Sequence, residues 1–120
     1  MRIFIAAMAI ALCHGCAATA PQESTPQGAQ QFAEGIKFYE DGKLEEAARR
    51  LQASLYLGLG VADRIEAHKH LAFTHCAAGR EDECRSEFRK VLAVNPSFEL
   101  SAAEAGHPVW GPIFREVKDN

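Results

Sequence analysis

Cysteine and histidine side chains are the residues of this 120-residue chain whose types could support metal or redox chemistry. Three histidines, His68, His70 and His75, are followed closely by Cys76. A metal site on one helix needs ligands three or four residues apart, so that they share a face. His68 and His75 are two turns apart and His70 points elsewhere, so the spacing predicts no metal site. A metal- or haem-binding periplasmic module that uses His68, His75 and Cys76 is kept as an alternative function of a different class.

Cys76 and Cys84 lie almost symmetrically about a turn that the sequence predicts at Ala78–Glu81. This symmetry places them on facing helices near the turn, where the Cα separation can suit a disulfide. An exported protein would allow the bond to form. The other interpretation is two buried small side chains at a close helix contact, and the sequence leaves both open. The spacing of the two cysteines matches no redox motif.

Neither the motifs nor the charge of the chain indicate catalysis or nucleic-acid binding. It contains no glycine-rich phosphate loop, no G-x-S-x-G and no H-E-x-x-H. Its 13 Lys+Arg against 16 Asp+Glu leave a net charge of −3, whereas nucleic-acid-binding domains are usually strongly basic. Hydrophobic residues make up 48% of the chain, which is enough for one small folded domain. We therefore expect a protein that is not an enzyme, has no catalytic residues, needs no cofactor and binds no nucleic acid.

The N-terminus has the three-part layout of an export signal. Arg2 supplies a positive charge, residues 3–12 are an uninterrupted apolar run, and small residues follow from Gly15. The apolar run is too short to span a bilayer as a stable helix. The sequence therefore predicts a signal peptide over residues 1–15.

The end of this signal, Leu12–Cys16, resembles a bacterial lipobox, in which a small residue precedes the cysteine that becomes lipid-modified. The resemblance implies a lipoprotein whose Cys16 carries acyl chains such as palmitate and holds the protein to a membrane. Because Ala17 and not aspartate follows, it implies the bacterial outer membrane, with the protein on the periplasmic face. Ordinary signal cleavage after Ala18 or Ala20 is the alternative.

Residues 16–30 are polar and small and include Pro21 and Pro26. Such a segment buries too little apolar surface to order itself, so we expect a flexible tether that leads to a folded domain at residues 31–118. In that domain the apolar residues recur at helical spacing and never alternate with period two. The pattern predicts an all-α fold.

Four helices are expected first, with breaks at Gly42, Gly58–Gly60 and Gly79. Asp63-x-x-Glu66 is predicted to cap the third helix, and Ser101-x-x-Glu104 to cap a short turn. A last helix, from Pro108 to Lys118, carries Trp110, which we expect to pack against the second helix pair. These breaks and caps divide the chain into two helical hairpins and a closing helix.

The two helix pairs repeat at a constant offset of 37 residues, which separates Gly42 from Gly79. Five further pairs share it: Gly35 and Ala72, Phe38 and His75, Ala47 and Cys84, Leu51 and Phe88, Leu55 and Leu92. This pattern resembles the tetratricopeptide repeat (TPR), a helix–turn–helix unit of about 34 residues, here with a longer connector. The resemblance implies TPR-like α-hairpin repeats: two helix-turn-helix units plus a C-terminal capping helix.

Proteins of this family bind other proteins on a concave surface lined by the first helix of each unit. The resemblance places eight residues in that partner-binding groove: Phe32, Ile36, Tyr39, Glu40, Glu66, Lys69, Phe73 and Ala77. For Phe32 and Phe73, ordinary packing between helices is the alternative. The outer face of the first helix pair has no N-terminal cap, so it is a candidate for self-association or partner docking.

The segment from Phe98 to Phe114 is most similar to the tail of small accessory lipoproteins associated with type VI secretion. That similarity implies an adaptor that binds the protein partners of a cell-envelope complex from the outer membrane. A pilotin-like factor or a scaffold for outer-membrane assembly is the alternative. Only the identity of the partner separates these two functions.

Overall fold

The computed structural model describes residues 22–120, and all regular structure within this range is helical. The predicted all-α class is therefore confirmed. The helices are α1 (Pro26–Glu40), α2 (Leu44–Leu57), α3 (Val61–Ala77), α4 (Glu81–Val94), α5 (Ala102–Ala105) and α6 (Trp110–Asp119). Across residues 22–120, no helix combines the length and the apolar character that crossing a bilayer requires.

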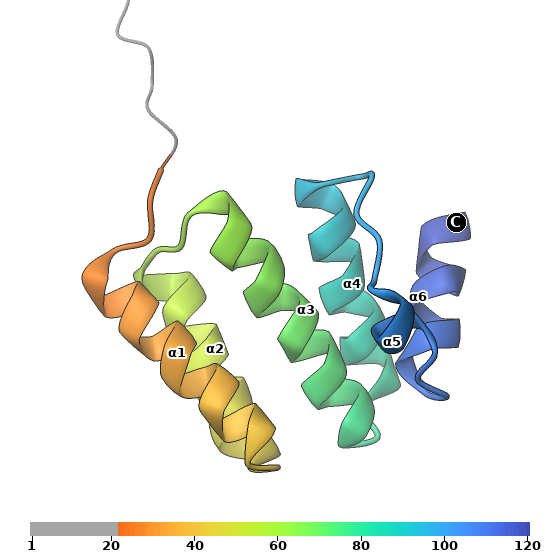
Figure 1. Ribbon diagram of the computed structural model, residues 1–120, viewed down its shortest axis with the longest axis horizontal. Helices are drawn as coiled ribbons and strands as arrows, with labels where there is room; N and C mark the ends of the chain where they lie inside the picture. The colour runs from red at the N-terminus through yellow and green to blue at the C-terminus, as the bar shows by residue number, and fades with distance from the viewer. Residues whose placement is uncertain (1–21) are drawn as a thin grey trace, which may run out of the picture.

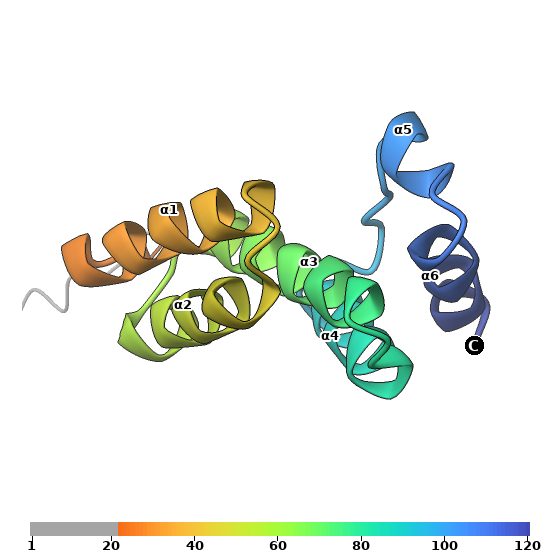
Figure 2. The same cartoon turned by 90° about the horizontal axis from the view of Figure 1, so that it is seen from below.

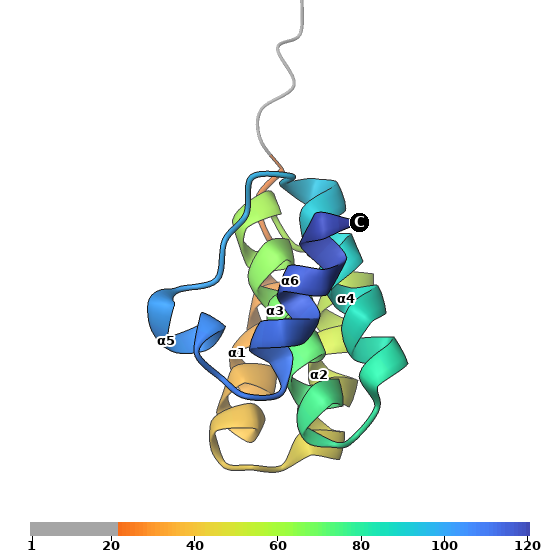
Figure 3. The same ribbon diagram turned by 90° about the vertical axis from the view of Figure 1, so that its right-hand side faces the viewer.

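The helices form two hairpins that stack side by side (Figure 1). In the first hairpin α1 packs on α2, in the second α3 packs on α4, and α2 and α3 join the two. Helix α6 packs against α4 on the free side of the second hairpin and also reaches α3. Figures 2 and 3 show that α5 lies on the same side of this stack as α1.

The two hairpin turns share one hydrogen-bond pattern, displaced by 37 residues. In each turn the glycine N–H donates to the carbonyl three residues back, and the next N–H donates to the carbonyl five residues back. Gly42 and Gly79 have φ of 74° and 80°, a left-handed conformation that glycine adopts most readily. Leu44–Leu57 and Glu81–Val94 are displaced by the same number of residues. The offset read from the sequence therefore holds for the local geometry of both turns.

Small residues lie where the paired helices approach one another. Ala47, Ala72 and Cys84 have no exposed surface. A Cβ on Gly35 would meet the Leu51 side chain at 2.7 Å, so α1 and α2 could not keep their present separation with a larger residue there. These contacts hold the apolar faces of each hairpin in one packed layer.

The N-terminal boundary of the folded domain differs from the prediction. Residues 26–30 were expected in the flexible tether, but they form the first turns of α1. The reason is a cap and a long-range contact: the Thr25 side chain accepts from the Gly28 N–H at 2.9 Å, and the Thr25 N–H donates to the Gly58 carbonyl at 3.0 Å. The predicted signal peptide, Cys16 and the start of the predicted tether lie outside the described residues.

The predicted cap at Asp63 is also wrong. Helix α3 begins at Val61 with Gly60 as its N-cap, three residues earlier than the predicted cap at Asp63. The Asp63 carboxylate instead accepts a hydrogen bond of 2.5 Å from the Ser24 hydroxyl, 39 residues back in the chain. The capping box of Ser101 and Glu104 is confirmed, because the side chain of each accepts from the backbone N–H of the other. The last helix begins at Trp110 and not at Pro108.

Candidate functional site

A row of five aromatic rings crosses from α1 over α3 to the start of α6. Tyr39 meets His70 at 5.3 Å and Phe73 at 6.4 Å between ring centroids. Trp110 stacks on Phe73 at 4.3 Å, and His107 stacks on Trp110 at 3.3 Å. We call these residues the aromatic row. It joins the first hairpin, the second hairpin and the C-terminal segment through direct ring contacts, which add to the stability from burial alone.

A buried ion pair next to the aromatic row attaches α5 to α3. The Lys69 ammonium lies 2.8 Å from the Glu66 carboxylate and 2.9 Å from the Glu104 carboxylate, and Lys69 is 8% exposed. Burial alone lowers the pKa of Lys69, but the hydrogen bonds to Glu66 and Glu104 outweigh it and the pKa is raised. The Trp110 indole N–H also donates to the Glu104 carbonyl at 2.9 Å. One charge-assisted contact, from Lys69 to Glu104, therefore joins the C-terminal segment to α3, and the Trp110 indole fixes the path of that segment.

This arrangement covers part of the predicted partner-binding groove. Phe73 is 2% exposed beneath Trp110, so Phe73 and Lys69 are covered by the chain's own C-terminal segment and are not open to a partner. For Phe73, the alternative interpretation as a packing residue is the one that the geometry supports. The expectation that Trp110 is a packing residue is confirmed.

The other six groove residues keep some accessible surface. Phe32 and Ile36 are half-buried against the core of the first hairpin. Tyr39 and Glu66 are half-buried beside the ion pair, and Glu40 and Ala77 are exposed. Burial and the nearby Glu104 carboxylate raise the pKa of Tyr39, which keeps its hydroxyl neutral. The accessible part of this face is therefore aromatic and acidic.

Cys76 and Cys84 form a disulfide that joins the last turn of α3 to the first turn of α4, with Cα atoms 5.3 Å apart. The sequence left open a disulfide or two buried free thiols, and the structure confirms the disulfide. A bonded Cys76 offers no thiolate to a metal ion, which removes one ligand of the alternative metal or haem site. Within residues 22–120, no group of three or more His, Cys, Asp or Glu side chains could hold an ion.

The histidines of α3 have other partners. His68 Nδ1 lies 2.6 Å from the Glu87 carboxylate, and His75 Nδ1 accepts from the Arg80 Nε–H at 3.0 Å. Burial lowers the pKa of His75, and the Arg80 guanidinium lowers it further. His75 is therefore a neutral acceptor beside the second hairpin turn and is 7% exposed.

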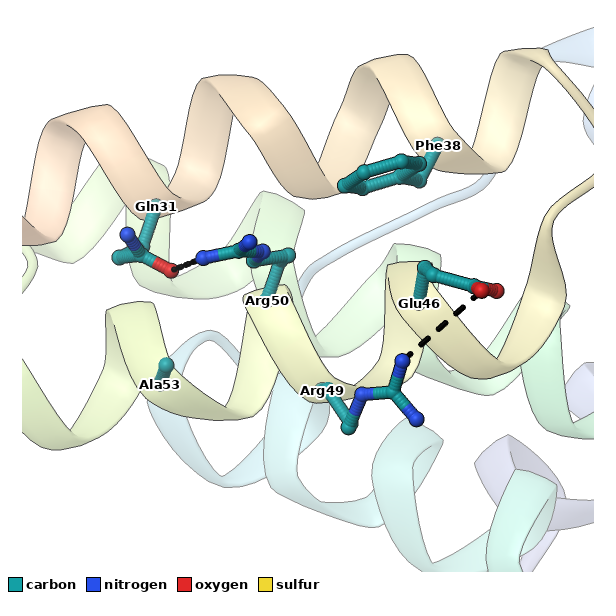
Figure 4. A pocket seen from close by; sticks show the side chains of 6 residues that line it. All are labelled: Gln31, Phe38, Glu46, Arg49, Arg50 and Ala53. Carbon is teal, nitrogen blue, oxygen red and sulfur yellow. Dashed lines mark hydrogen bonds and ion pairs between the residues drawn. The ribbon is translucent and has the colours of Figure 1, made fainter.

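The outer face of the first hairpin, away from α3, contains a hollow of about 280 Å³ (Figure 4). Six side chains line it: Gln31, Phe38, Glu46, Arg49, Arg50 and Ala53. The Arg50 guanidinium donates to Gln31 at 3.1 Å, and its carbon lies 6.0 Å from the centroid of the Phe38 ring. This is the face that is predicted as a candidate for self-association or partner docking, and its lining combines one aromatic ring with three charged side chains.

Comparison of the chain with protein-family models, with curated proteins and with solved structures finds no match. The class of this protein is therefore described from its fold and its candidate site alone. It is an all-α protein of two stacked helical hairpins. The chain's own C-terminal segment covers part of the face formed by α1 and α3.

Proposed function

We propose that this protein is a TPR-like lipoprotein that acts as an adaptor, binding protein partners of a cell-envelope complex from the periplasmic face of the outer membrane. One observation carries the TPR-like part of the proposal. The turns at Gly42 and Gly79 have identical hydrogen-bond patterns, and α2 and α4 have identical lengths, at an offset of 37 residues. Repetition of one helix–turn–helix unit in both sequence and backbone is typical of such arrays, whose curved surfaces bind proteins.

The accessible part of the groove supports binding over chemistry. Tyr39 offers an aromatic surface, and the carboxylates of Glu40 and Glu66 lie on the same pair of helices, α1 and α3. A partner segment with apolar and basic side chains fits such a face, because opposite charges at the rim steer association and set orientation.

The disulfide and the two sequence resemblances support the location. A structural disulfide is typical of an oxidising compartment such as the bacterial periplasm. The lipobox at Leu12–Cys16 supports an N-terminal lipid anchor. The tail from Phe98 to Phe114 supports type VI secretion as the envelope system.

Site-specific photo-crosslinking in the native cell tests the adaptor proposal. A photoreactive phenylalanine replaces Glu40 or Ala77, both exposed on the groove side, and Gln52, exposed on α2, serves as the matched control. We expect both groove positions to cross-link one subunit of an envelope complex and position 52 not to. The mass of the adduct identifies that subunit as part of type VI secretion or of another assembly. Equal adducts from position 52, or none from positions 40 and 77, would refute the groove.

A further inference from the structure

The residues that precede α1, 22–25, lie at one end of the first hairpin, beside the connector between α2 and α3. Ser24 and Thr25 are bonded there: the Gly60 N–H donates to the Ser24 hydroxyl at 3.0 Å, and the Thr25 N–H donates to the Gly58 carbonyl. A Cβ on Gly60 would come within 2.7 Å of the Gln22 carbonyl oxygen. We call residues 56–64, which contain the connector between α2 and α3, together with residues 22–25, the entry end.

The short distance along the chain from Cys16 to the entry end restricts where the domain can lie. Six residue steps separate Cys16 from Gln22, and six extended residues span at most about 20 Å. If Cys16 is acylated, as the proposed function holds, the entry end cannot move farther than this from the lipid. The predicted tether of fifteen residues would have allowed more than twice that reach, but its last part is helical.

The entry end also has most of the exposed large apolar side chains of residues 22–120. Four such residues are exposed in this range, and three of them are Tyr56 at 91%, Leu57 at 41% and Val61 at 50%. Tyr56 and Leu57 end α2 and Val61 begins α3, so all three flank the connector. The fourth, Val109, precedes α6 at the opposite end of the stack (Figure 1).

Basic residues accompany these apolar side chains. Val61 shares a hollow of about 560 Å³ with Arg64, His68 and Lys90. The Arg64 Nε is buried and has no hydrogen-bond partner among the described residues, whereas Lys90 pairs with Glu87 at 2.8 Å. The acidic neighbours are Glu23, which is exposed, Asp63, which accepts from Ser24, and Glu87, which pairs with both His68 and Lys90. Within residues 22–120, no carboxylate forms an ion pair with Arg64, so its guanidinium adds positive charge to the entry end.

We propose that the entry end rests on the lipid surface, with Tyr56, Leu57 and Val61 at the boundary between headgroups and acyl chains and Arg64 facing lipid phosphates. Tyrosine is enriched at this boundary because its ring is apolar and its hydroxyl is polar. Basic side chains are attracted to anionic headgroups. The acyl anchor raises the local concentration of the entry end at the bilayer, so that a few side chains are enough to orient the domain.

Fluorescence quenching of the full, acylated protein in vesicles of phosphatidylethanolamine and phosphatidylglycerol tests this orientation. Trp110 is the only native tryptophan, so Tyr56→Trp and Val109→Trp each add one reporter to the same background. Brominated acyl chains quench only tryptophans that contact them. We expect the emission added by Tyr56→Trp to fall roughly two-fold in brominated vesicles, because interfacial aromatic rings reach the upper acyl chains. The emission of the native protein and of Val109→Trp should stay unchanged.

The acylation of Cys16 is measured on the same samples by intact mass, which separates the two proposals. An acylated protein in which Tyr56→Trp is not quenched, or is quenched no more than Val109→Trp, would overturn the membrane orientation and leave the lipoprotein proposal standing. An unmodified Cys16 would overturn both. If Tyr56→Trp is unquenched and cross-linking yields a dimer through this end, a second copy covers it instead of lipid.

Discussion

The indole of Trp110 lies on the ring of Phe73, with ring centroids 4.3 Å apart and planes inclined by 23°. This contact places the start of α6 over the C-terminal half of α3, on the face that α3 would otherwise share with α1 as an open groove. Phe73 also meets Phe88 of α4 edge-on at 6.1 Å. The Phe73 ring therefore connects the second hairpin to the C-terminal segment. Its packing stabilises the fold, and its surface is not available for binding a partner.

Phe73→Ala is expected to destabilise the fold by about 4 kcal/mol, because it empties a site packed on several sides by other rings. Urea unfolding followed by helical circular dichroism measures this change. The emission of Trp110 should shift to the red at the same time, since the indole loses its cover. Tyr56→Ala, at a 91% exposed site, is the control and should change the free energy of unfolding by about 0.5 kcal/mol or less. Wild-type stability of Phe73→Ala would contradict the packing role.

The ion pair of Lys69 and Glu104 should make stability depend on acidic pH. Burial raises the pKa of Glu104, but hydrogen bonds from Lys69 and Ser101 outweigh it and lower the pKa below 4.5. A carboxyl with a lower pKa in the folded than in the unfolded chain stabilises the fold above its unfolded pKa, and that stability is lost as pH falls through the folded value.

Glu104→Gln should therefore reduce the decline of the unfolding temperature as pH falls from neutral to below 4.5. Thermal unfolding over that pH range measures the profile. Part of the slope should remain, because the pKa of Glu87 is also lowered: burial opposes this, but hydrogen bonds from His68 and Lys90 outweigh it. The exposed Glu40→Gln is the control and should keep the wild-type slope. If Glu104→Gln also keeps it, the ion pair does not stabilise the fold in solution.

Reduction of the Cys76–Cys84 disulfide is expected to lower the free energy of unfolding by about 2.5 kcal/mol. The bond joins two residues that are eight positions apart, and the loop it closes lowers the entropy of the unfolded chain. The measurement is urea unfolding with and without a thiol reductant. A double variant, Cys76→Ala with Cys84→Ala, should have the reduced stability under both conditions. Sensitivity of that double variant to the reductant would show that the effect comes from elsewhere.

Gly42→Ala and Gly79→Ala should each lower the free energy of unfolding by about 1 to 2 kcal/mol, because both glycines have positive φ. An added Cβ would meet nothing within 4 Å in either turn, so the backbone conformation alone causes the loss. The two costs should agree closely if the turns are true equivalents in a repeat. Gly106→Ala is the matched control: its φ of −77° suits alanine, so it should be neutral or slightly stabilising. Clearly unequal costs at residues 42 and 79 would argue against a structural repeat.

The sequence predicted best the features that depend on neighbouring residues. Helix type follows from apolar spacing, and the turns at Gly42 and Gly79 follow from the need for glycine at positive φ. The capping box of Ser101 and Glu104 also needs only four consecutive residues. The cap at Asp63 failed under the same reasoning, because Ser24, which is distant in the chain, takes its carboxylate.

Other features depended on how distant segments meet. Whether Cys76 and Cys84 are bonded rests on the separation of two packed helices, and the sequence contains only their symmetry about a turn. The start of α1 rests on a contact between Thr25 and Gly58, which no local pattern indicates. In the same way, the pairing of Lys69 with Glu104 depends on the path of the segment between α4 and α6.

By itself, the sequence determined the helical class, the repeat offset of 37 residues and the positions of the hairpin turns, because hydrogen bonding and side-chain spacing within a helix are local. The tertiary structure alone decided that Phe73 and Lys69 lie under the C-terminal segment and that Ser24 and Thr25 are bonded to the connector between α2 and α3. Those outcomes depend on which surfaces come together when apolar area is buried, and a one-dimensional pattern does not specify that choice.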